Sequence, residues 1–206
     1  MHAKTLLVLS GLAALGSAFT LPGDLANGLY EVSYNEVGEE VHRLVKTDFE
    51  STYVTLDHTK RGAVGNSRQT WCGCAFPMNA GDTNIANQRI ADYASSSPQL
   101  GAGAARYAIQ NSAVSFICNF SAVSSITVPS NLVSNNAVDI SYNCGNFIAG
   151  TSRMRPYEHT DYGYMNYSSG LNFCGAAEFS KQGTCPDATG GKVRRVVRGS
   201  SEARKI

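Results

Sequence analysis

No cysteine precedes Cys72 in this 206-residue chain, although six occur from that point on. A dibasic pair, Lys60-Arg61, stands shortly before the first of them. Charge divides at the same place. Residues 19–61 hold eight acidic and four basic side chains, a net charge of −4, whereas residues 62–206 hold eight acidic and twelve basic ones, a net charge of +4. This division predicts an acidic prosegment over residues 19–61 that masks a basic domain by electrostatic attraction, and cleavage after Arg61.

The sequence also lacks an apolar run long enough to cross a membrane. Residues 5–18 are apolar, but a spanning helix needs roughly 20 such residues, and Pro22 follows soon afterwards. The basic start at Lys4 and the small residues before the expected cut after Ala18 are typical of a secretory signal peptide over residues 1–18. We therefore predict export, an extracellular location and no transmembrane segment.

Export determines how the cysteines are interpreted. In an oxidising compartment, six cysteines in a domain of this size predict three disulfides. The six are Cys72, Cys74, Cys118, Cys144, Cys174 and Cys185. Zinc is the weaker alternative, because a Cys-x-Cys spacing is too short for the usual ligand pair and no second close pair exists. Fifteen pairings are possible. The favoured one has a local bridge between Cys174 and Cys185, with Cys72 and Cys74 bonded to the two remaining cysteines.

Strand and helix signals alternate after the dibasic pair. Asp82-Thr83 can cap a helix over residues 84–95, and a second helix is expected over residues 130–144. Strands are predicted at residues 71–76, 106–110, 112–119, 146–151 and 162–167. This order predicts an α+β fold: a disulfide-stabilised antiparallel sheet with two helices on one face, as in a split βαβ sandwich. The β-rich residues 120–128 leave a small β-barrel or β-sandwich as the alternative.

The segments on either side of this region are predicted as follows. Residues 62–189 form the cysteine-rich mature domain, and residues 190–206 form a basic, disordered tail. Within the prosegment, residues 29–34 and 39–44 have the alternation of a β-hairpin. That hairpin either belongs to a disposable prosegment or supplies strands to the main domain without cleavage, and both interpretations stay open at this stage.

Motifs of common enzymes are missing. After Arg61 the only histidine is His159, and no Gly-x-Ser-x-Gly, His-Glu-x-x-His or phosphate-binding loop occurs. His159 with Asp161 and a serine could serve a hydrolase, and two of the three acids Glu158, Asp161 and Glu178 could form an acid pair for glycoside cleavage. The segment that holds most of them is typical of a charged, solvated loop. We therefore predict no enzymatic activity, no catalytic residue, no metal site and no cofactor.

Binding is the better-supported class of function. Tyrosine and arginine, which are enriched at protein interfaces, gather between Arg153 and Cys174. The candidate target-binding residues are Arg153, Arg155, Tyr157, Tyr162 and Tyr164. The alternative is that the tyrosines alternate on a strand and pack internally. The basic tail lacks interleaved aromatic residues, so no nucleic-acid partner is predicted. Two sequons, at Asn119 and Asn166, are possible glycosylation sites.

The layout of signal peptide, acidic prosegment, kexin-type Lys60-Arg61 site and cysteine-rich domain resembles the secreted effectors and toxins of filamentous fungi. Trp-Cys-Gly-Cys at residues 71–74, Val-Ser-Phe-Ile-Cys at residues 114–118 and the second helix ending in Cys144-Gly145 are similar to the killer-toxin-like and necrosis-inducing α/β effector families. The resemblance implies a monomeric virulence or toxin-like protein that binds a host or competitor protein outside the producing cell. It carries over no site residues. The alternatives are an extracellular inhibitor of host proteases, papain-like or other, and a small secreted hydrolase.

Overall fold

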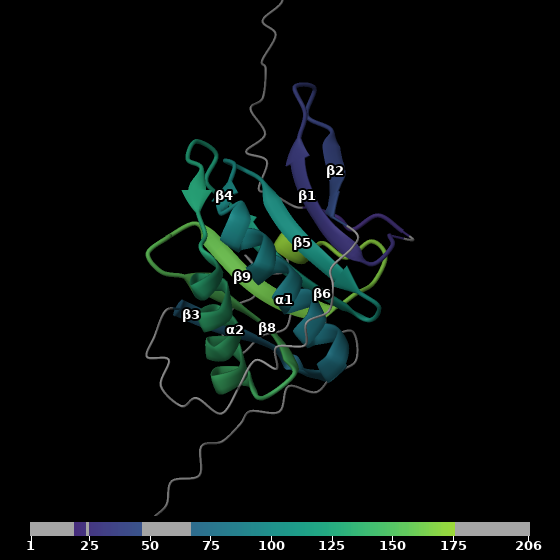
Figure 1. The fold of residues 1–206 in the computed structure, drawn as a ribbon, viewed down its shortest axis with the longest axis vertical. Helices are drawn as coiled ribbons and strands as arrows, with labels where there is room; N and C mark the ends of the chain where they lie inside the picture. Colours follow the sequence, from purple (N-terminus) through teal and green to yellow (C-terminus); the bar gives the residue numbers. More distant parts are fainter. Residues whose placement is uncertain (1–18, 24, 47–66, 176–206) are drawn as a thin grey trace, which may run out of the picture.

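The computed structural model describes residues 19–23, 25–46 and 67–175. Its main strands are β1 (Gly28–Tyr34), β2 (Glu40–Lys46), β3 (Ser67–Pro77), β5 (Ala105–Gln110), β6 (Ala113–Asn119), β8 (Ile148–Met154) and β9 (Thr160–Asn166). They form one antiparallel sheet in the order β2-β1-β5-β6-β9-β8-β3 (Figure 1). Two short strands, β4 (Gln99–Leu100) and β7 (Ile126–Thr127), pair separately.

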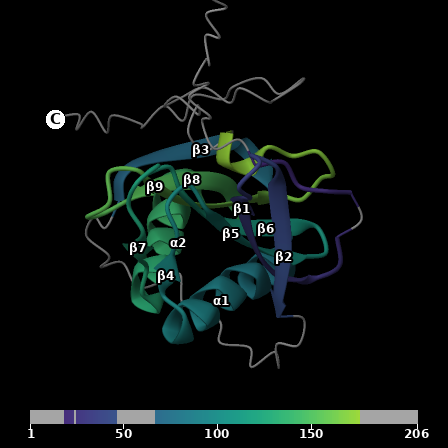
Figure 2. The ribbon, with the colours of Figure 1, turned by 90° about the horizontal axis from the view of Figure 1, so that it is seen from above.

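Two helices, α1 (Ala80–Ser96) and α2 (Ser130–Cys144), pack on one face of this sheet. The buried apolar residues of both helices, such as Ile90 and Ile140, form one cluster with residues from the strands beneath them. Gly150 permits the close approach of α2 to the sheet, because a Cβ atom there would lie 2.6 Å from Cγ2 of Ile140. Viewed from above, the sheet curves around the two helices (Figure 2).

The first helix begins earlier than the sequence predicts. Its cap is Asn79, whose side-chain oxygen accepts a hydrogen bond of 3.0 Å from the backbone N–H of Asp82. Asp82 lies instead in the first turn, where a negative charge suits the helix dipole, and its carboxylate accepts a hydrogen bond from the Ser112 hydroxyl at 2.6 Å. Burial alone would raise the pKa of Asp82, but hydrogen bonds from Ser112 and Asn111 outweigh it and hold that pKa below its usual value.

The predicted α+β class, with an antiparallel sheet, is confirmed. The sheet is not a closed barrel, because β2 and β3 are its two edges, so the barrel alternative is wrong. Strand β9 lies between β6 and β8 in the sheet, and α2 lies between β6 and β8 along the chain. The β-rich residues 120–128 supply only the two-residue strand β7.

The opposite face of the sheet is covered by two segments from far apart in the chain. The N–H of Leu21 donates to the carbonyl of Leu171 at 2.9 Å, and Thr20 forms a β-bridge with Asn172. Beneath them a second apolar cluster is centred on Phe173, whose ring centroid lies 5.2 Å from that of Tyr107 and 5.4 Å from that of Phe116. The central strands β5 and β6 are therefore buried on both faces.

The hairpin ahead of the dibasic pair belongs to this sheet. Residues 28–32 of β1 pair with β5, and β2 lies beyond β1 as an edge strand. Leu29 faces the helices, whereas Tyr30 and Val32 join the second cluster. The hairpin thus supplies strands to the main sheet, as the second interpretation holds, whereas the absence of cleavage that went with it is not tested. The signal peptide, Lys60-Arg61 and the tail lie outside the described residues, so cleavage at either predicted point stays a prediction.

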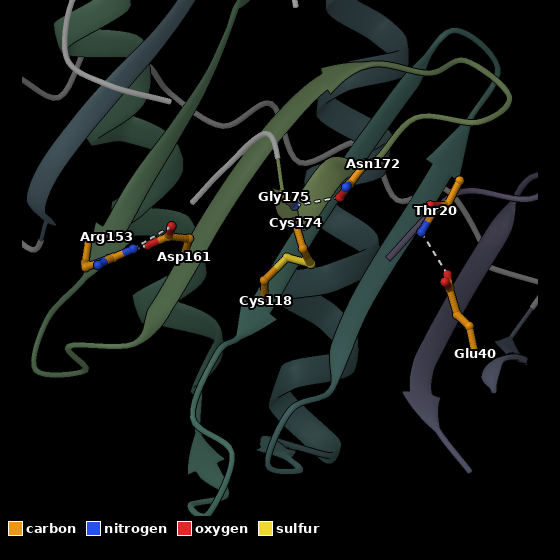
Figure 3. Close-up of a disulfide and its surroundings, with 8 residues drawn as sticks. All are labelled: Thr20, Glu40, Cys118, Arg153, Asp161, Asn172, Cys174 and Gly175. Atoms are coloured by element: carbon orange, nitrogen blue, oxygen red, sulfur yellow. Dashed lines mark hydrogen bonds and ion pairs between the residues drawn. A yellow bond between two sulfur atoms is a disulfide. The ribbon is translucent and has the colours of Figure 1, made fainter. Parts of the chain in front are cut away.

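The disulfides correct the predicted pairing. Cys118 bonds Cys174, with a Cα–Cα distance of 5.8 Å (Figure 3), so the predicted local bridge between Cys174 and Cys185 is wrong. Cys72 bonds Cys144 and joins β3 to the end of α2. This bond is one of those that the favoured pairing allowed for Cys72. Cys174 follows Phe173 directly, and packing of that ring on the sheet brings its neighbour to β6. The side chain of Cys74, and Cys185, lie outside the described part of the chain.

Candidate functional site

The predicted binding surface between Arg153 and Cys174 is largely core. Tyr162 is 0% exposed and Tyr164 is 1% exposed. Both point toward the helices, where the hydroxyl of Tyr162 donates to Oδ1 of Asn87 at 2.8 Å and that of Tyr164 lies 3.1 Å from the Ser141 hydroxyl. Burial raises the pKa of Tyr164 to about 12, partly offset by this second hydrogen bond. Neither tyrosine can contact a partner, so their assignment to a binding surface is wrong.

The other predicted binding residues are mostly occupied by internal contacts. Arg153 donates two hydrogen bonds to the buried carboxylate of Asp161, the shorter of 2.7 Å (Figure 3), and its guanidinium lies over the ring of Trp71. Tyr157 is half-buried, and its hydroxyl donates to the carbonyl of Thr127. Only Arg155 of the five is exposed. They form no continuous surface.

Of the residues considered for hydrolysis, those in the described part of the chain do not come together as a catalytic group. His159 is exposed in the turn before β9, whereas Asp161 is fully buried and engaged by Arg153. Glu158 is exposed, and Glu178 lies outside the described residues. The His159–Asp161 pairing on which the hydrolase alternative depended is therefore not formed.

A different polar chain connects the hairpin to the sheet. Nδ1 of His42, on β2, lies 2.7 Å from the hydroxyl of Tyr107, on β5. Nε2 of the same ring lies 2.7 Å from Oε1 of Glu40, which also accepts a hydrogen bond of 2.8 Å from the N–H of Thr20 (Figure 3). Hydroxyl, imidazole and carboxylate thus follow one another as in an activated nucleophile. His42 is not among the predicted site residues, because it lies in the predicted prosegment, residues 19–61.

The environment of Tyr107 makes this chain structural. Its ring is fully buried and stacks on Tyr30 at a centroid distance of 5.1 Å. Burial raises the pKa of Tyr107, and the nearby Tyr30 and Glu40 raise it further. A neutral hydroxyl without access to solvent cannot attack a substrate. The chain of hydrogen bonds therefore fastens β2 to β5 across β1.

In contrast to the buried Tyr107, aromatic side chains are exposed at the end of the molecule where α2 terminates. Tyr142, on the last turn of α2, is 77% exposed, and Phe76, on edge strand β3, is 43% exposed. The Cys72–Cys144 bridge joins these two elements, and the N–H of Met78 donates to the carbonyl of Phe147 at 2.8 Å just beyond it. Two exposed aromatic side chains thus stand on elements that a disulfide cross-links. We call Tyr142, Phe76 and this bridge the α2–β3 end.

The two sequons have contrasting surroundings. Asn119 is fully buried, and its amide donates to the carbonyls of Gly101 at 2.7 Å and Ser124 at 2.9 Å. Asn166 lies at the end of β9 and is exposed. A glycan on Asn119 would remove a donor that the fold uses and would need space inside the protein.

We expect glycosylation at Asn166 and none at Asn119 in folded, secreted protein. Peptide mapping before and after glycosidase treatment measures occupancy at each site. Asn166→Gln should remove the whole glycan mass and leave the melting temperature nearly unchanged, because exposed substitutions change stability by only about 0.5 kcal/mol or less. Asn119→Gln serves as the buried comparison and should lower the melting temperature. Substantial occupancy at Asn119 in native material would contradict this assignment.

No family model matches the chain, and no match was found among curated proteins or solved structures. The resemblance to fungal effectors therefore stays a prediction. Within the described residues, no group of three or more His, Cys, Asp or Glu side chains is placed to hold a metal ion. In that same part of the chain, no helix is both long enough and apolar enough to span a membrane.

Proposed function

We propose that this is a secreted effector or toxin-like protein that binds a host or competitor protein outside the producing cell. The observation that carries the proposal is the α2–β3 end. Tyr142 and Phe76 are exposed there, although α2 packs its other side into the core and Trp71 of β3 is buried. Tyrosine is among the residues that dominate binding energy in interfaces. The binding surface proposed here is therefore the α2–β3 end, in place of the one predicted between Arg153 and Cys174.

The disulfide gives this end a physical advantage in binding. Association costs free energy for every side chain and loop that must be ordered on contact. Tyr142 stands two residues before Cys144, and Phe76 stands four residues after Cys72, so the bridge holds both backbones in place before a partner arrives. A preordered aromatic pair loses less entropy on binding than the same residues in a loop.

Replacing Tyr142 and Phe76 with alanine, singly, tests the proposal. Truncation of a hot-spot aromatic typically costs about 2 kcal/mol of binding, roughly thirtyfold in affinity. We expect each variant to need a correspondingly higher dose to affect host tissue or a competing microbe, with a melting temperature close to that of the parent protein. The same doses should be tested on extracellular host proteases, since loss of inhibition there would identify the target class.

Val123→Ala is the matched control, because this side chain is 89% exposed and belongs to the 120–125 loop rather than the α2–β3 end. It should leave both activity and melting temperature unchanged. If both aromatic variants keep full activity, the α2–β3 end is not the binding surface. If activity falls only together with melting temperature, these side chains support the fold and the proposal fails.

A further inference from the structure

Residues 19–46 form a unit whose covalent connection to the later described residues runs through residues 47–66 alone. β1 adds to the open side of β5 by backbone pairing over residues 28–32. Phe19 and Leu21 are buried against the opposite face of the same sheet, where Phe19 stacks on Tyr34 and Phe173. This unit therefore contacts the rest of the sheet in two ways: by strand pairing with β5 and by apolar packing on one face.

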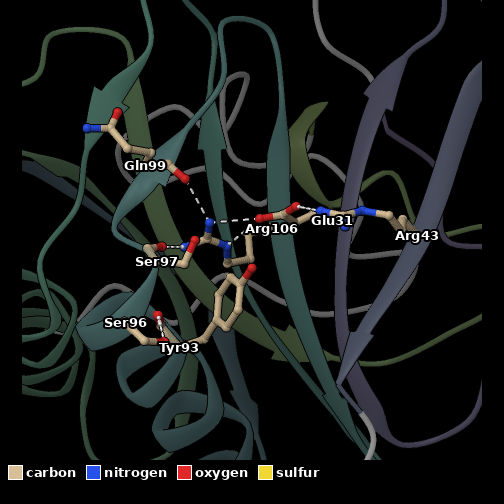
Figure 4. A network of polar contacts seen from close by, with 7 residues as sticks. All are labelled: Glu31, Arg43, Tyr93, Ser96, Ser97, Gln99 and Arg106. Atoms are coloured by element: carbon tan, nitrogen blue, oxygen red, sulfur yellow. Dashed lines mark hydrogen bonds and ion pairs between the residues drawn. The ribbon is translucent and has the colours of Figure 1, made fainter.

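A partly buried ion pair joins the unit to β5. Arg106 is 0% exposed, and its guanidinium donates to Oε1 of Glu31 at 2.8 Å (Figure 4). The same guanidinium donates to the carbonyls of Ser97 at 3.0 Å and Gln99 at 2.8 Å. Among the described residues, Glu31 supplies the carboxylate that pairs with Arg106, and it comes from the hairpin. If the hairpin left, Arg106 would lose its countercharge, which is costly for a desolvated cation.

Two further polar links lie on the same seam. The Tyr107–His42–Glu40 chain described above spans from β5 to β2. At the other end of β5, the side chain of Asn27 accepts from the N–H of Asn111 at 2.7 Å and donates to Oδ1 of Asn111 at 2.9 Å. Apolar burial, strand pairing, an ion pair and these hydrogen bonds all act along one boundary. None of them depends on the covalent connection through residues 47–66.

We propose that the hairpin unit stays bound as a second chain after the backbone is cut between β2 and β3, so that the processed protein is a non-covalent complex of two chains. No cysteine precedes Cys72, so no disulfide can hold the unit, and the interface alone retains it. The partner that fits the open edge of β5 is thus a segment of this same chain. A cut at Lys60-Arg61 would nick the protein without removing its prosegment.

The test uses a full chain starting at Phe19, in which a recognition sequence for a site-specific protease replaces Lys60-Arg61 and its neighbours. A denaturing, non-reducing gel first verifies that cutting is complete. Native mass spectrometry and size-exclusion chromatography at low micromolar concentration should then show one species with the mass of both fragments. Two separate species under these native conditions would overturn the proposal.

Glu31→Gln in the same chain measures the contribution of the ion pair. Because the amide keeps the shape but loses the charge opposite Arg106, the dissociation constant of the cut complex should rise at least about tenfold. Glu36→Gln is the matched control, since Glu36 is an exposed carboxylate at the tip of the same hairpin, and it should leave the constant unchanged. Equal effects of the two substitutions would show that the Glu31–Arg106 contact does not hold the unit. The unsubstituted cut chain decides the main proposal even if Glu31→Gln folds poorly.

Discussion

A chain that begins at Gly62 is expected not to reach the native fold, whereas a chain that begins at Phe19 does. The shorter chain lacks β1, β2 and five large buried apolar side chains: Phe19, Leu21, Leu29, Tyr30 and Val32. Each contributes about 1.5–3 kcal/mol when buried, so their sum is roughly 10 kcal/mol. Because whole domains are stable by only about 5–15 kcal/mol, this loss is comparable with the entire free energy of unfolding.

Both chains should be refolded side by side under oxidising conditions. Near-ultraviolet circular dichroism and thermal unfolding report tertiary packing, and we expect a cooperative transition only for the chain from Phe19. A cooperative transition at the same temperature in the chain from Gly62 would show that the hairpin is dispensable. That result would restore the interpretation of residues 19–61 as a disposable prosegment.

The two described disulfides are expected to differ sharply in how easily they are reduced. Cys118 and Cys174 are fully buried, whereas Cys72 is exposed and Cys144 is half-buried. Thiol–disulfide exchange requires access of the attacking thiolate to a sulfur atom. A low concentration of reductant should therefore open Cys72–Cys144 first. Alkylation followed by peptide mapping identifies the opened bridge, and preferential labelling of Cys118 or Cys174 would contradict the structure.

Removal of either bridge should destabilise the protein strongly. The bridges join residues 56 and 72 positions apart, and loops of this size give about 4 kcal/mol of stabilisation in the chain-entropy description. We expect Cys118→Ala with Cys174→Ala to lower the free energy of unfolding by roughly that amount, measured by urea denaturation. Alanine is used because a serine hydroxyl at these buried positions would add a desolvation cost of its own. The Cys72→Ala, Cys144→Ala pair provides the comparison at an exposed bridge.

Local structure could be predicted well from the sequence. The predicted strands at residues 106–110 and 112–119 and the helix at 130–144 agree closely with β5, β6 and α2. These elements follow from short-range rules: the alternation of apolar residues, the turn at Asn111, which takes a positive φ of 43°, and the glycine after Cys144. The predicted start of the first helix, residue 84, lies four residues after the observed start of α1 at Ala80, because Asn79 and not Asp82 caps the helix.

The side on which each residue lies, and its partner, depended on long-range packing. The tyrosines of β9 alternate as a surface strand would, but β9 lies inside the sheet with helices above it, so Tyr162 and Tyr164 are core. Their sequence neighbours contain no signal of that cover. Apolar residues in the hairpin likewise fit either a prosegment or a sheet strand, and only the open edge of β5 distinguishes the two.

The sequence alone thus carried the local elements, the division of charge and the clustering of cysteines after the dibasic pair, because these depend on residue type and short spacing. The three-dimensional arrangement showed that Cys72 meets Cys144 and Cys118 meets Cys174, that the hairpin completes the sheet, and which of the described aromatic side chains remain exposed. The physical reason is that a disulfide, a strand pairing and a buried ring each require two segments far apart in the chain to be brought together. Composition and periodicity describe one segment at a time, whereas the packing of Phe173 on the sheet placed Cys174 beside Cys118.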